Sequence, residues 1–295
     1  MIADDGTHVL AARDIATPAA TCSVSVPAHG DSSPWRQTLL RAMALAPVNQ
    51  VYAVVGGKHG RWWRQALYPL PPHNIGFQPH TGSSVAGILL PLLNILETDP
   101  GADIVIMPSN QQVRLEPILL DSLRLALELL PALDRRVVLL GSDPCEPDPQ
   151  HDYVVPALNY LRDGSPMDVV RFVAKPTASV AGRLISRGAL WNTSILAAQG
   201  GELLQLFEHR IPEIVANMRR YLHERTGGAR HITTIRTLYR QLRTVDFSKD
   251  ILQGQPDSLK VLQVPACTWM DRAAVKTNEK TIETASTKTE NRHHG

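Results

Sequence analysis

Two polar residues at the ends of apolar runs are the first candidates for chemistry in this sequence. Lys175 and Pro176 follow the apolar run 169–173, and Asn192 opens a second apolar run after an intervening helical segment. If both runs are strands of an open α/β sheet, a cation and an amide lie at one rim, where such sheets bind ligands. The arrangement therefore predicts a pocket for an anionic ligand. The alternative is a lysine exposed at a strand end and an amide that caps a turn.

A second candidate lies at the start of a predicted helix over 85–97. Ser83 or Ser84 can cap this helix and Gly82 precedes them, which leaves free backbone N–H groups aimed at the loop after a short strand that ends at Gln78. Backbone donors of this kind suit a nucleotide base or a phosphate. The same residues can also do no more than begin the helix.

The elements that must position these groups alternate along the chain. Apolar runs bounded by turn residues predict strands, and apolar residues at helical intervals predict helices. This alternation favours an α/β fold, with a mostly parallel central sheet flanked by helices, built as a single domain over 1–271. The expected strands are 50–55, 75–78, 102–107, 136–140, 169–173 and 259–264, and the expected helices are 34–46, 85–97, 115–133, 202–225 and 232–242.

Composition excludes several classes of partner. The chain has 295 residues, of which 43% are hydrophobic and 20% charged, close to globular averages. A net charge of +2 calls for neither nucleic acid nor an anionic membrane. The longest apolar segment, 85–96, is interrupted and too short to span a bilayer. The three cysteines have no metal spacing and the N-terminus does not read as a secretory signal, so we expect a cytoplasmic protein.

The two ends of the chain are expected to add little regular structure. Residues 1–33 are rich in Ala, Thr, Ser, Asp and Pro, with only short apolar pieces. From residue 272 to residue 295 almost nothing is available for burial, so this polar tail is expected to be disordered.

Several segments, taken in order, resemble the sugar-1-phosphate nucleotidyltransferases, and specifically the mannose-1-phosphate guanylyltransferases. They are QPHTGSSVAGILLPL, IVIMPSN, RFVAKP, GALWNTSI and CTWMD, which are similar to the family patterns QPxNRGTAPGILLPL, VxxxPSDH, RFxEKP, GALWNSxI and CGWSD. The similarity runs from about Trp35 to Asp271. It implies a Rossmann-like, GT-A-like nucleotidyltransferase domain.

The resemblance also implies a reaction and a set of roles. The family joins GTP to mannose 1-phosphate, which forms GDP-mannose and releases pyrophosphate, with Mg²⁺ as the metal. Lys175 would meet the sugar phosphate with Asn192 beside it, and Asp271 would hold the metal, so that Lys175 and Asp271 are the catalytic candidates. Asp271 can also be an ordinary loop aspartate. The candidates for binding the nucleotide are Gly6, Thr7, Gln78, Gly82, Ser83, Ser109 and Asn110.

The sequence departs from the family where the charges of the reaction are carried. The family begins with a strand and a Gly-rich loop resembling LAGGDGTRL, whose arginine faces the triphosphate. Here most of that strand is missing, so we expect the first strand to be truncated, and His8 stands at the arginine position. Asn110 replaces the metal-binding aspartate of the PSD segment, and Ala174 replaces the acid of EKP. Asp152 stands where the sugar-contacting loop has a glycine.

Two hypotheses of different class follow from these losses. One is a transferase with weak or no activity, in which Lys175 orients the sugar phosphate and positioning supplies most of the catalysis. The other is a catalytically dead homologue that binds a nucleotide or sugar nucleotide, or that partners an active relative. Preorganised charge is usually the largest catalytic contribution, so the loss of several charged groups favours very low activity.

Overall fold

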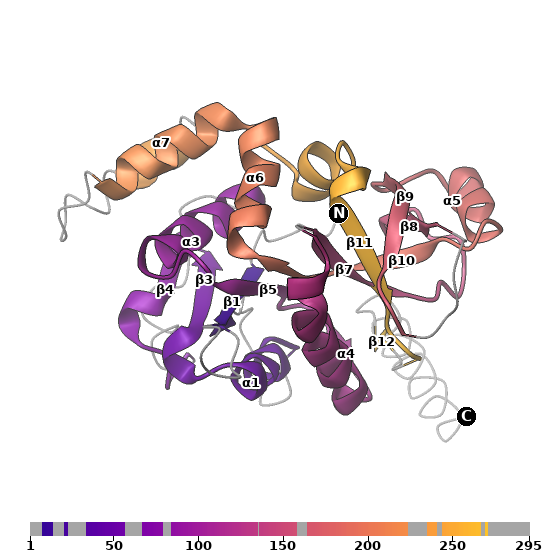
Figure 1. Cartoon of the computed structure of the whole chain (residues 1–295), viewed down its shortest axis with the longest axis horizontal. Helices are drawn as coiled ribbons and strands as arrows, with labels where there is room; N and C mark the ends of the chain where they lie inside the picture. Colours follow the sequence, from indigo (N-terminus) through magenta and orange to yellow (C-terminus); the bar gives the residue numbers. More distant parts are fainter. Residues whose placement is uncertain are drawn as a thin grey trace, which may run out of the picture.

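A large mixed sheet forms the centre of the protein (Figure 1). The computed structural model describes residues 8–13, 21–22, 34–56, 67–78, 84–134, 136–157, 164–223, 235–240, 244–266 and 269–270. Ten strands are paired in the order β4-β3-β1-β5-β10-β7-β11-β9-β8, with β2 paired to β5 beside this path. These strands are β1 (His8–Arg13), β2 (Thr21–Cys22), β3 (Val51–Gly56), β4 (Ile75–Gln78), β5 (Asp103–Pro108), β7 (Val137–Ser142), β8 (Tyr153–Pro156), β9 (Met167–Val173), β10 (Leu190–Gln199) and β11 (Leu259–Gln263). A separate two-stranded sheet joins β6 (Gln112–Val113) to β12 (Trp269–Met270).

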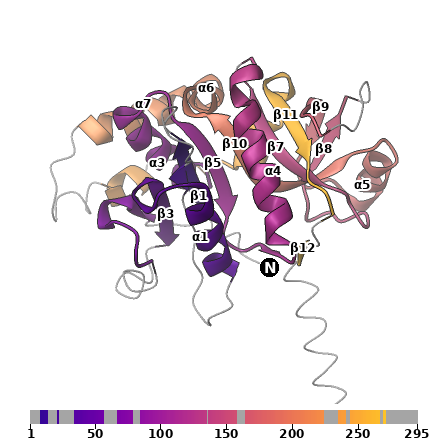
Figure 2. The same ribbon diagram turned by 60° about the horizontal axis from the view of Figure 1, so that its bottom comes forward.

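Helices cover both faces of this sheet (Figures 1 and 2). On one face lie α1 (Pro34–Leu45) and α4 (Glu116–Leu129), and on the other lie α3 (Ser84–Thr98), α6 (Gly200–Arg210) and α7 (Pro212–His223). The short helix α5 (Ala178–Ile185) packs beside β8 at one end of the molecule. The other described helical segments are a stretch at 235–240, within the expected helix over 232–242, a π-helix, η5 (Phe247–Leu252), and four 3-10 turns: η1 (Val48–Gln50), η3 (Pro72–Asn74), η4 (Leu130–Ala132) and η6 (Pro256–Ser258).

Side chains alternate between the two faces of the central strands, so the core consists of two clusters, one on each face of the sheet. In β5, Ile104 and Ile106 join the cluster under α3 and α6, whereas Val105 and Met107 join the cluster under α1 and α4. All six residues of β5 are buried, as expected of a strand covered on both faces. The prediction of an α/β fold with flanking helices is therefore confirmed.

The prediction of a mostly parallel sheet is wrong. Within the described residues, seven of the ten pairings in the large sheet are antiparallel, and only β2–β5, β3–β4 and β7–β11 are parallel. The cause is that β10 runs antiparallel between β5 and β7, and β1 runs antiparallel between β3 and β5. A continuous apolar run indicates burial on both faces and carries no information on strand direction.

Part of the large sheet closes on itself. β10 pairs with β7 on one side and, through Leu190 and Trp191, with β8. Since β8 pairs with β9, β9 with β11 and β11 with β7, these five strands form a small barrel-like ring at one end of the sheet. The strand β8 falls in a segment for which the sequence pattern predicted no element.

Two other boundaries differ from the predicted ones. The expected helix over 202–225 is two helices, because Pro212 has no backbone N–H to donate within a continuous helix and instead begins α7. The stretch 1–33 was predicted to be irregular, yet β1 lies within it and occupies the place between β3 and β5. The tail from 272 lies outside the described residues, so the limits of the domain stay a prediction.

Candidate functional site

Lys175 and Asn192, the two residues that were expected to share a rim, meet at a third residue, Asp152. The backbone N–H of Lys175 donates to Asp152 Oδ1 at 3.1 Å, and the backbone N–H of Asn192 donates to the Asp152 carbonyl oxygen at 2.8 Å. The strands explain this meeting, because Tyr153 of β8 pairs with Val173 of β9 and with Trp191 of β10. The ends of three strands therefore deliver the three residues to one place.

Lys175 has an unusual backbone and an available charge. Its φ is 40°, a left-handed conformation that a side chain disfavours. The preceding N–H, that of Ala174, donates to Gln253 Oε1 at 2.8 Å. The Lys175 side chain is exposed and forms no ion pair with any described residue. The cation is thus free to meet an anion from solution, while its backbone is held.

Asn192 lies in an irregular part of β10. The register of β10 against β7 shifts between Asn192 and Leu196, and Ser194 within this bulge has a φ of 59°. The Oδ1 of Asn192 accepts from the N–H of Ser194 at 3.3 Å, and Thr193 Oγ1 donates to the Leu140 carbonyl at 2.7 Å. Asn192 therefore uses its oxygen to cap the bulge, which is the structural alternative noted for it. Its predicted contact with a ligand stays a prediction.

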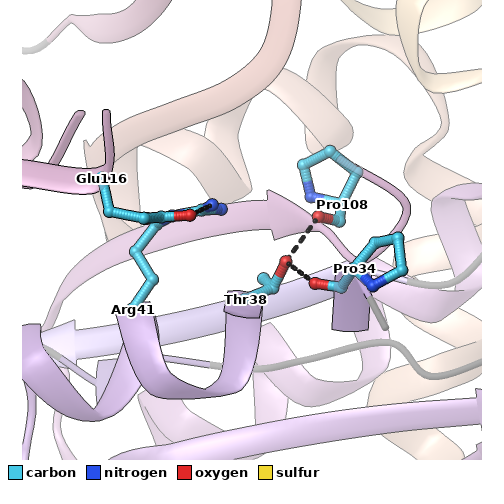
Figure 3. A network of polar contacts seen from close by, with 5 residues as sticks. All are labelled: Pro34, Thr38, Arg41, Pro108 and Glu116. Carbon is cyan, nitrogen blue, oxygen red and sulfur yellow. Dashed lines mark hydrogen bonds and ion pairs between the residues drawn. The ribbon is translucent and has the colours of Figure 1, made fainter. Parts of the chain in front are cut away.

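The end of β5 is tied to the same part of β10. Ser109 is buried and Asn110 is exposed, and the Nε2 of the next residue, Gln111, donates to the Thr193 carbonyl. On the side of the sheet covered by α1, Thr38 Oγ1 donates to the Pro108 carbonyl oxygen at 3.4 Å (Figure 3). The loop that carries Ser109 and Asn110 is therefore fixed between α1 and β10.

The predicted metal ligand Asp271 lies outside the described residues, but the strand that leads to it is described. β12 pairs with β6 so that Met270 lies opposite Gln112, two residues after Asn110. Directly opposite residues in an antiparallel pair have Cα atoms about 4.5–5.5 Å apart. The pairing therefore carries the chain, one residue before Asp271, to the segment that contains Asn110.

The remaining nucleotide-binding candidates are only partly described. Gln78 is buried at the end of β4 and pairs with Gly56 of β3. β4 is three strand spacings from β5, about 14 Å, so Gln78 does not join the cluster around Asn110. Four further candidates, Gly6, Thr7, Gly82 and Ser83, lie outside the described residues.

Burial dominates the electrostatics of Asp152. Its pKa is raised, chiefly because burial disfavours the charged carboxylate, and the charge of Asp246 adds to this. Hydrogen bonds from Ser248 and from the Lys175 backbone, together with the Lys175 charge, act in the opposite direction and do not cancel it. Burial of the Asp152 side chain that accepts from Lys175 therefore outweighs the interactions that favour its charged form.

Replacing Asp152 with asparagine is expected to stabilise the protein at neutral pH. A carboxyl group whose pKa is higher in the folded state binds more protons when folded, so stability falls as pH rises from its usual value of 3.8 through the raised value. Asparagine keeps the acceptor oxygen and removes this penalty. Thermal unfolding of both proteins from pH 3 to pH 8 should show a gain for Asp152→Asn near neutrality that disappears at the acid end. A gain that is independent of pH would contradict the assignment.

The described residues do not fit a magnesium ion. Among them, no group of three His, Cys, Asp or Glu side chains is arranged to hold a metal. Asn110 offers one neutral carbonyl oxygen, whereas Mg²⁺ in such sites is bound through carboxylates and phosphates. No step of a reaction is therefore assigned to a metal here.

A separate cavity of about 340 Å³ opens at the mouth of the barrel-like ring. Its walls include Asp143, Pro156, Met167, Leu190 and Gln263, and most of its lining is apolar. None of the predicted site residues lines it. Lys175, which meets Asp152 and Asn192, is exposed to solvent instead. Its position therefore suits a charged ligand better than the apolar cavity does.

Two residues that hold the site escaped prediction as site residues. In the sequence, Asp152 is notable only because the family has a glycine at this position. An acidic residue just before a strand could have indicated a site residue. Gln253 lies 79 residues from its partner Ala174, and nothing in its local sequence marks it. Contacts of this kind depend on the folded chain.

Comparison with known proteins finds likeness in structure but not in sequence. No family model matches the chain, and no curated protein matches it in sequence. A crystal structure described as mannose-1-phosphate geranyltransferase from Thermus thermophilus is similar with a TM-score of 0.65 and 19% identity, over 79% of this chain and 64% of that one. The chain thus spans somewhat less than two thirds of that protein.

A second structure, of mannose-6-phosphate isomerase from Helicobacter pylori, has a TM-score of 0.65 and 14% identity over 84% of this chain and 98% of the other. At such identities the likeness concerns the fold. Among the described helices, none has the length and apolar character needed to cross a membrane. The resemblance first seen in the ordered motifs is therefore confirmed at the level of architecture, and the chain has a sugar-nucleotidyltransferase-like fold.

Proposed function

We propose that this protein binds a sugar 1-phosphate, or the nucleotide sugar made from it, and has little or no transferase activity. The proposal rests on the meeting of Lys175, Asp152 and Asn192. The Lys175 ammonium is exposed and, among the described residues, unpaired, while the Lys175 backbone N–H donates to the buried carboxylate of Asp152. By its resemblance to mannose-1-phosphate guanylyltransferases, the expected ligands are mannose 1-phosphate and GDP-mannose, with GTP as the nucleotide.

The weakness of the reaction follows from the side chains around the anion. A transferase must stabilise the negative charge that is redistributed when the oxygen of a sugar phosphate attacks a nucleotide phosphorus. At the described positions where the family carries charge, Asn110 and Ala174 offer none. Each missing group of this kind costs about 2.7–4 kcal/mol in the transition state, so the losses together amount to several powers of ten in rate.

Binding does not need the same groups. A sugar phosphate can be held in place by one cation and a few hydrogen-bond donors, since a charge-assisted hydrogen bond contributes roughly twice as much as a neutral one. Lys175 supplies the cation, and the exposed Ser194 in the neighbouring bulge presents a hydroxyl on the same strand as Asn192. The site is thus better equipped to bind than to catalyse.

Pyrophosphate release from GTP and mannose 1-phosphate, measured with Mg²⁺ present, tests the catalytic half of the proposal. We expect a rate far below the typical enzymatic turnover of about one per second or more. Turnover near one per second would overturn this half and would make the protein an ordinary transferase.

Replacing Lys175 with alanine is expected to abolish ligand binding. Thermal shift measured against mannose 1-phosphate and GDP-mannose should show stabilisation of the natural protein, because a ligand that binds only the folded state raises its stability by mass action. The Lys175→Ala protein should show none. Lys249→Ala removes another exposed lysine, from η5, and serves as the matched control, with a shift like that of the natural protein. Equal shifts in all three proteins would remove Lys175 from the site.

A further inference from the structure

The turn at Ala174 and Lys175 is held from two separate elements. Asp152, at the start of β8, accepts from the N–H of Lys175 at 3.1 Å. Gln253, directly after the π-helix η5, accepts from the N–H of Ala174 at 2.8 Å. Two consecutive backbone donors thus end on side chains that lie 23 and 79 residues away in sequence.

This double attachment has a physical reason. A residue other than glycine in the left-handed region costs about 1–2 kcal/mol, and such a conformation persists only where its surroundings over-determine it. Each hydrogen bond to the turn contributes about 1 kcal/mol net, so two of them offset the cost of the φ of 40° at Lys175. Without one of them, the turn is free to relax toward the right-handed side.

The element that carries Gln253 is itself fixed. At the start of η5, Asp246 Oδ1 accepts from the N–H of Lys249 at 2.8 Å, and Asp250 Oδ2 accepts from the N–H of Asp246 at 2.8 Å. The Nε of Arg210, at the end of α6, donates to the Asp250 carbonyl at 2.9 Å. These hydrogen bonds anchor the π-helix as a support for Gln253.

The same support reaches Asp152. A side-chain hydrogen bond from Ser248 of η5 is among the interactions that favour the Asp152 carboxylate. Consequently η5 holds the turn directly through Gln253 and indirectly through Ser248 and Asp152. The segment η5, which precedes β11 in the chain, is thus linked to the turn that follows β9.

We propose that Gln253 and Asp152 are positioning residues, which hold the Ala174–Lys175 turn so that the Lys175 ammonium meets the phosphate of a sugar 1-phosphate. The inference rests on the proposed function of Lys175 and adds the residues that make it effective. Neither residue touches the ligand. Their effect on binding passes entirely through the backbone of the turn.

The experiment compares three variants of the full chain with the natural protein. Gln253→Met keeps the size of the exposed side chain and removes the acceptor, so the fold should be retained. Gln253→Glu restores an acceptor oxygen at the same distance along the side chain. Gln255→Met is the matched control, because the Gln255 side chain donates to the Leu206 and Ile251 carbonyls and forms no hydrogen bond with the turn.

Two measurements are made on each protein. Amide hydrogen exchange of the Ala174–Lys175 segment should be about fivefold faster in Gln253→Met, the change expected for the loss of one hydrogen bond of about 1 kcal/mol, and should return toward the natural rate in Gln253→Glu. Titration with mannose 1-phosphate should give affinity about five- to tenfold weaker in Gln253→Met and unchanged in Gln255→Met.

The outcomes separate the inference from the function on which it rests. Natural binding that disappears in Lys175→Ala but is unaffected in Gln253→Met would overturn the positioning role and leave the binding site intact. Unchanged amide exchange in Gln253→Met would also overturn it, whether or not a ligand binds. Absence of any binding by the natural protein would overturn the proposed function, and the role of Gln253 in binding with it.

Discussion

Replacing Glu116 with alanine is expected to lower the free energy of unfolding by about 3 kcal/mol, because it leaves a buried guanidinium without its partner. The Nε and Nη2 of Arg41 donate to the two carboxylate oxygens of Glu116 at 2.9 and 2.6 Å (Figure 3). The Arg41 side chain is 0% exposed and that of Glu116 30% exposed. Breaking a fully buried pair costs about 3–5 kcal/mol, and we take the lower end because water reaches Glu116.

The measurement is thermal or urea unfolding, with a control on the same helix. Asp121 of α4 pairs with Arg124 at 3.0 Å, but these side chains are 74% and 50% exposed. Asp121→Ala should therefore change stability by less than about 0.5 kcal/mol. Equal losses in Glu116→Ala and Asp121→Ala would contradict a special role for the buried pair.

The Arg41–Glu116 pair also bears on the site. Arg41 lies one turn after Thr38, whose hydroxyl is close to the Pro108 carbonyl, and Glu116 opens the helix that follows the Asn110 loop. The pair therefore joins the helix under the end of β5 to the helix that follows the loop. A double replacement, Arg41→Met with Glu116→Leu, removes both charges and should recover much of the lost stability, since a paired buried charge contributes little net free energy.

The fold was predictable to the extent that burial determines it. The centre of β5, from Ile104 to Met107, is a continuous apolar run, and the strand was predicted from it. The helices that cover the strand were predicted from the helical spacing of their own apolar residues. The direction of β10 was not predictable from its own residues, because an apolar run has the same pattern in parallel and antiparallel sheets. The direction of β10 shows only in its antiparallel pairings with β5, β7 and β8, which are far away in sequence.

The candidate site likewise contains residues that could be predicted from the sequence and residues that could not. Lys175 and Asn192 could be predicted as neighbours because each stands where a run of apolar residues stops or begins. Asp152 and Gln253 could not, because their role is to accept from backbone N–H groups far away in sequence. Any residue with a carbonyl oxygen can do this chemically, so residue type alone identifies neither.

Replacing Asn110 with aspartate is expected to raise the affinity for Mg²⁺ in the presence of GTP by about tenfold or more. A carboxylate in place of the amide adds a full negative charge, which Mg²⁺ prefers in its ligands, and about 1.4 kcal/mol of added interaction gives a factor of ten. Asn110 is exposed at the end of β5, so the new charge needs no burial. The pairing of Met270 with Gln112 leads the chain toward this position one residue before Asp271.

Calorimetric titration of MgCl₂ into protein with GTP measures this effect. Asn217→Asp, at an exposed position of α7, adds the same charge and should leave the affinity unchanged. A double variant, Asn110→Asp with Asp271→Ala, should lose most of the gain if the two carboxylates act on one ion, since coupled residues do not contribute additively. Equal affinities in Asn110→Asp and the natural protein would show that this edge of the sheet is no longer arranged to hold a cation. Pyrophosphate release should stay far below about one per second even in Asn110→Asp, because a metal ligand alone does not replace the charges missing at His8 and Ala174.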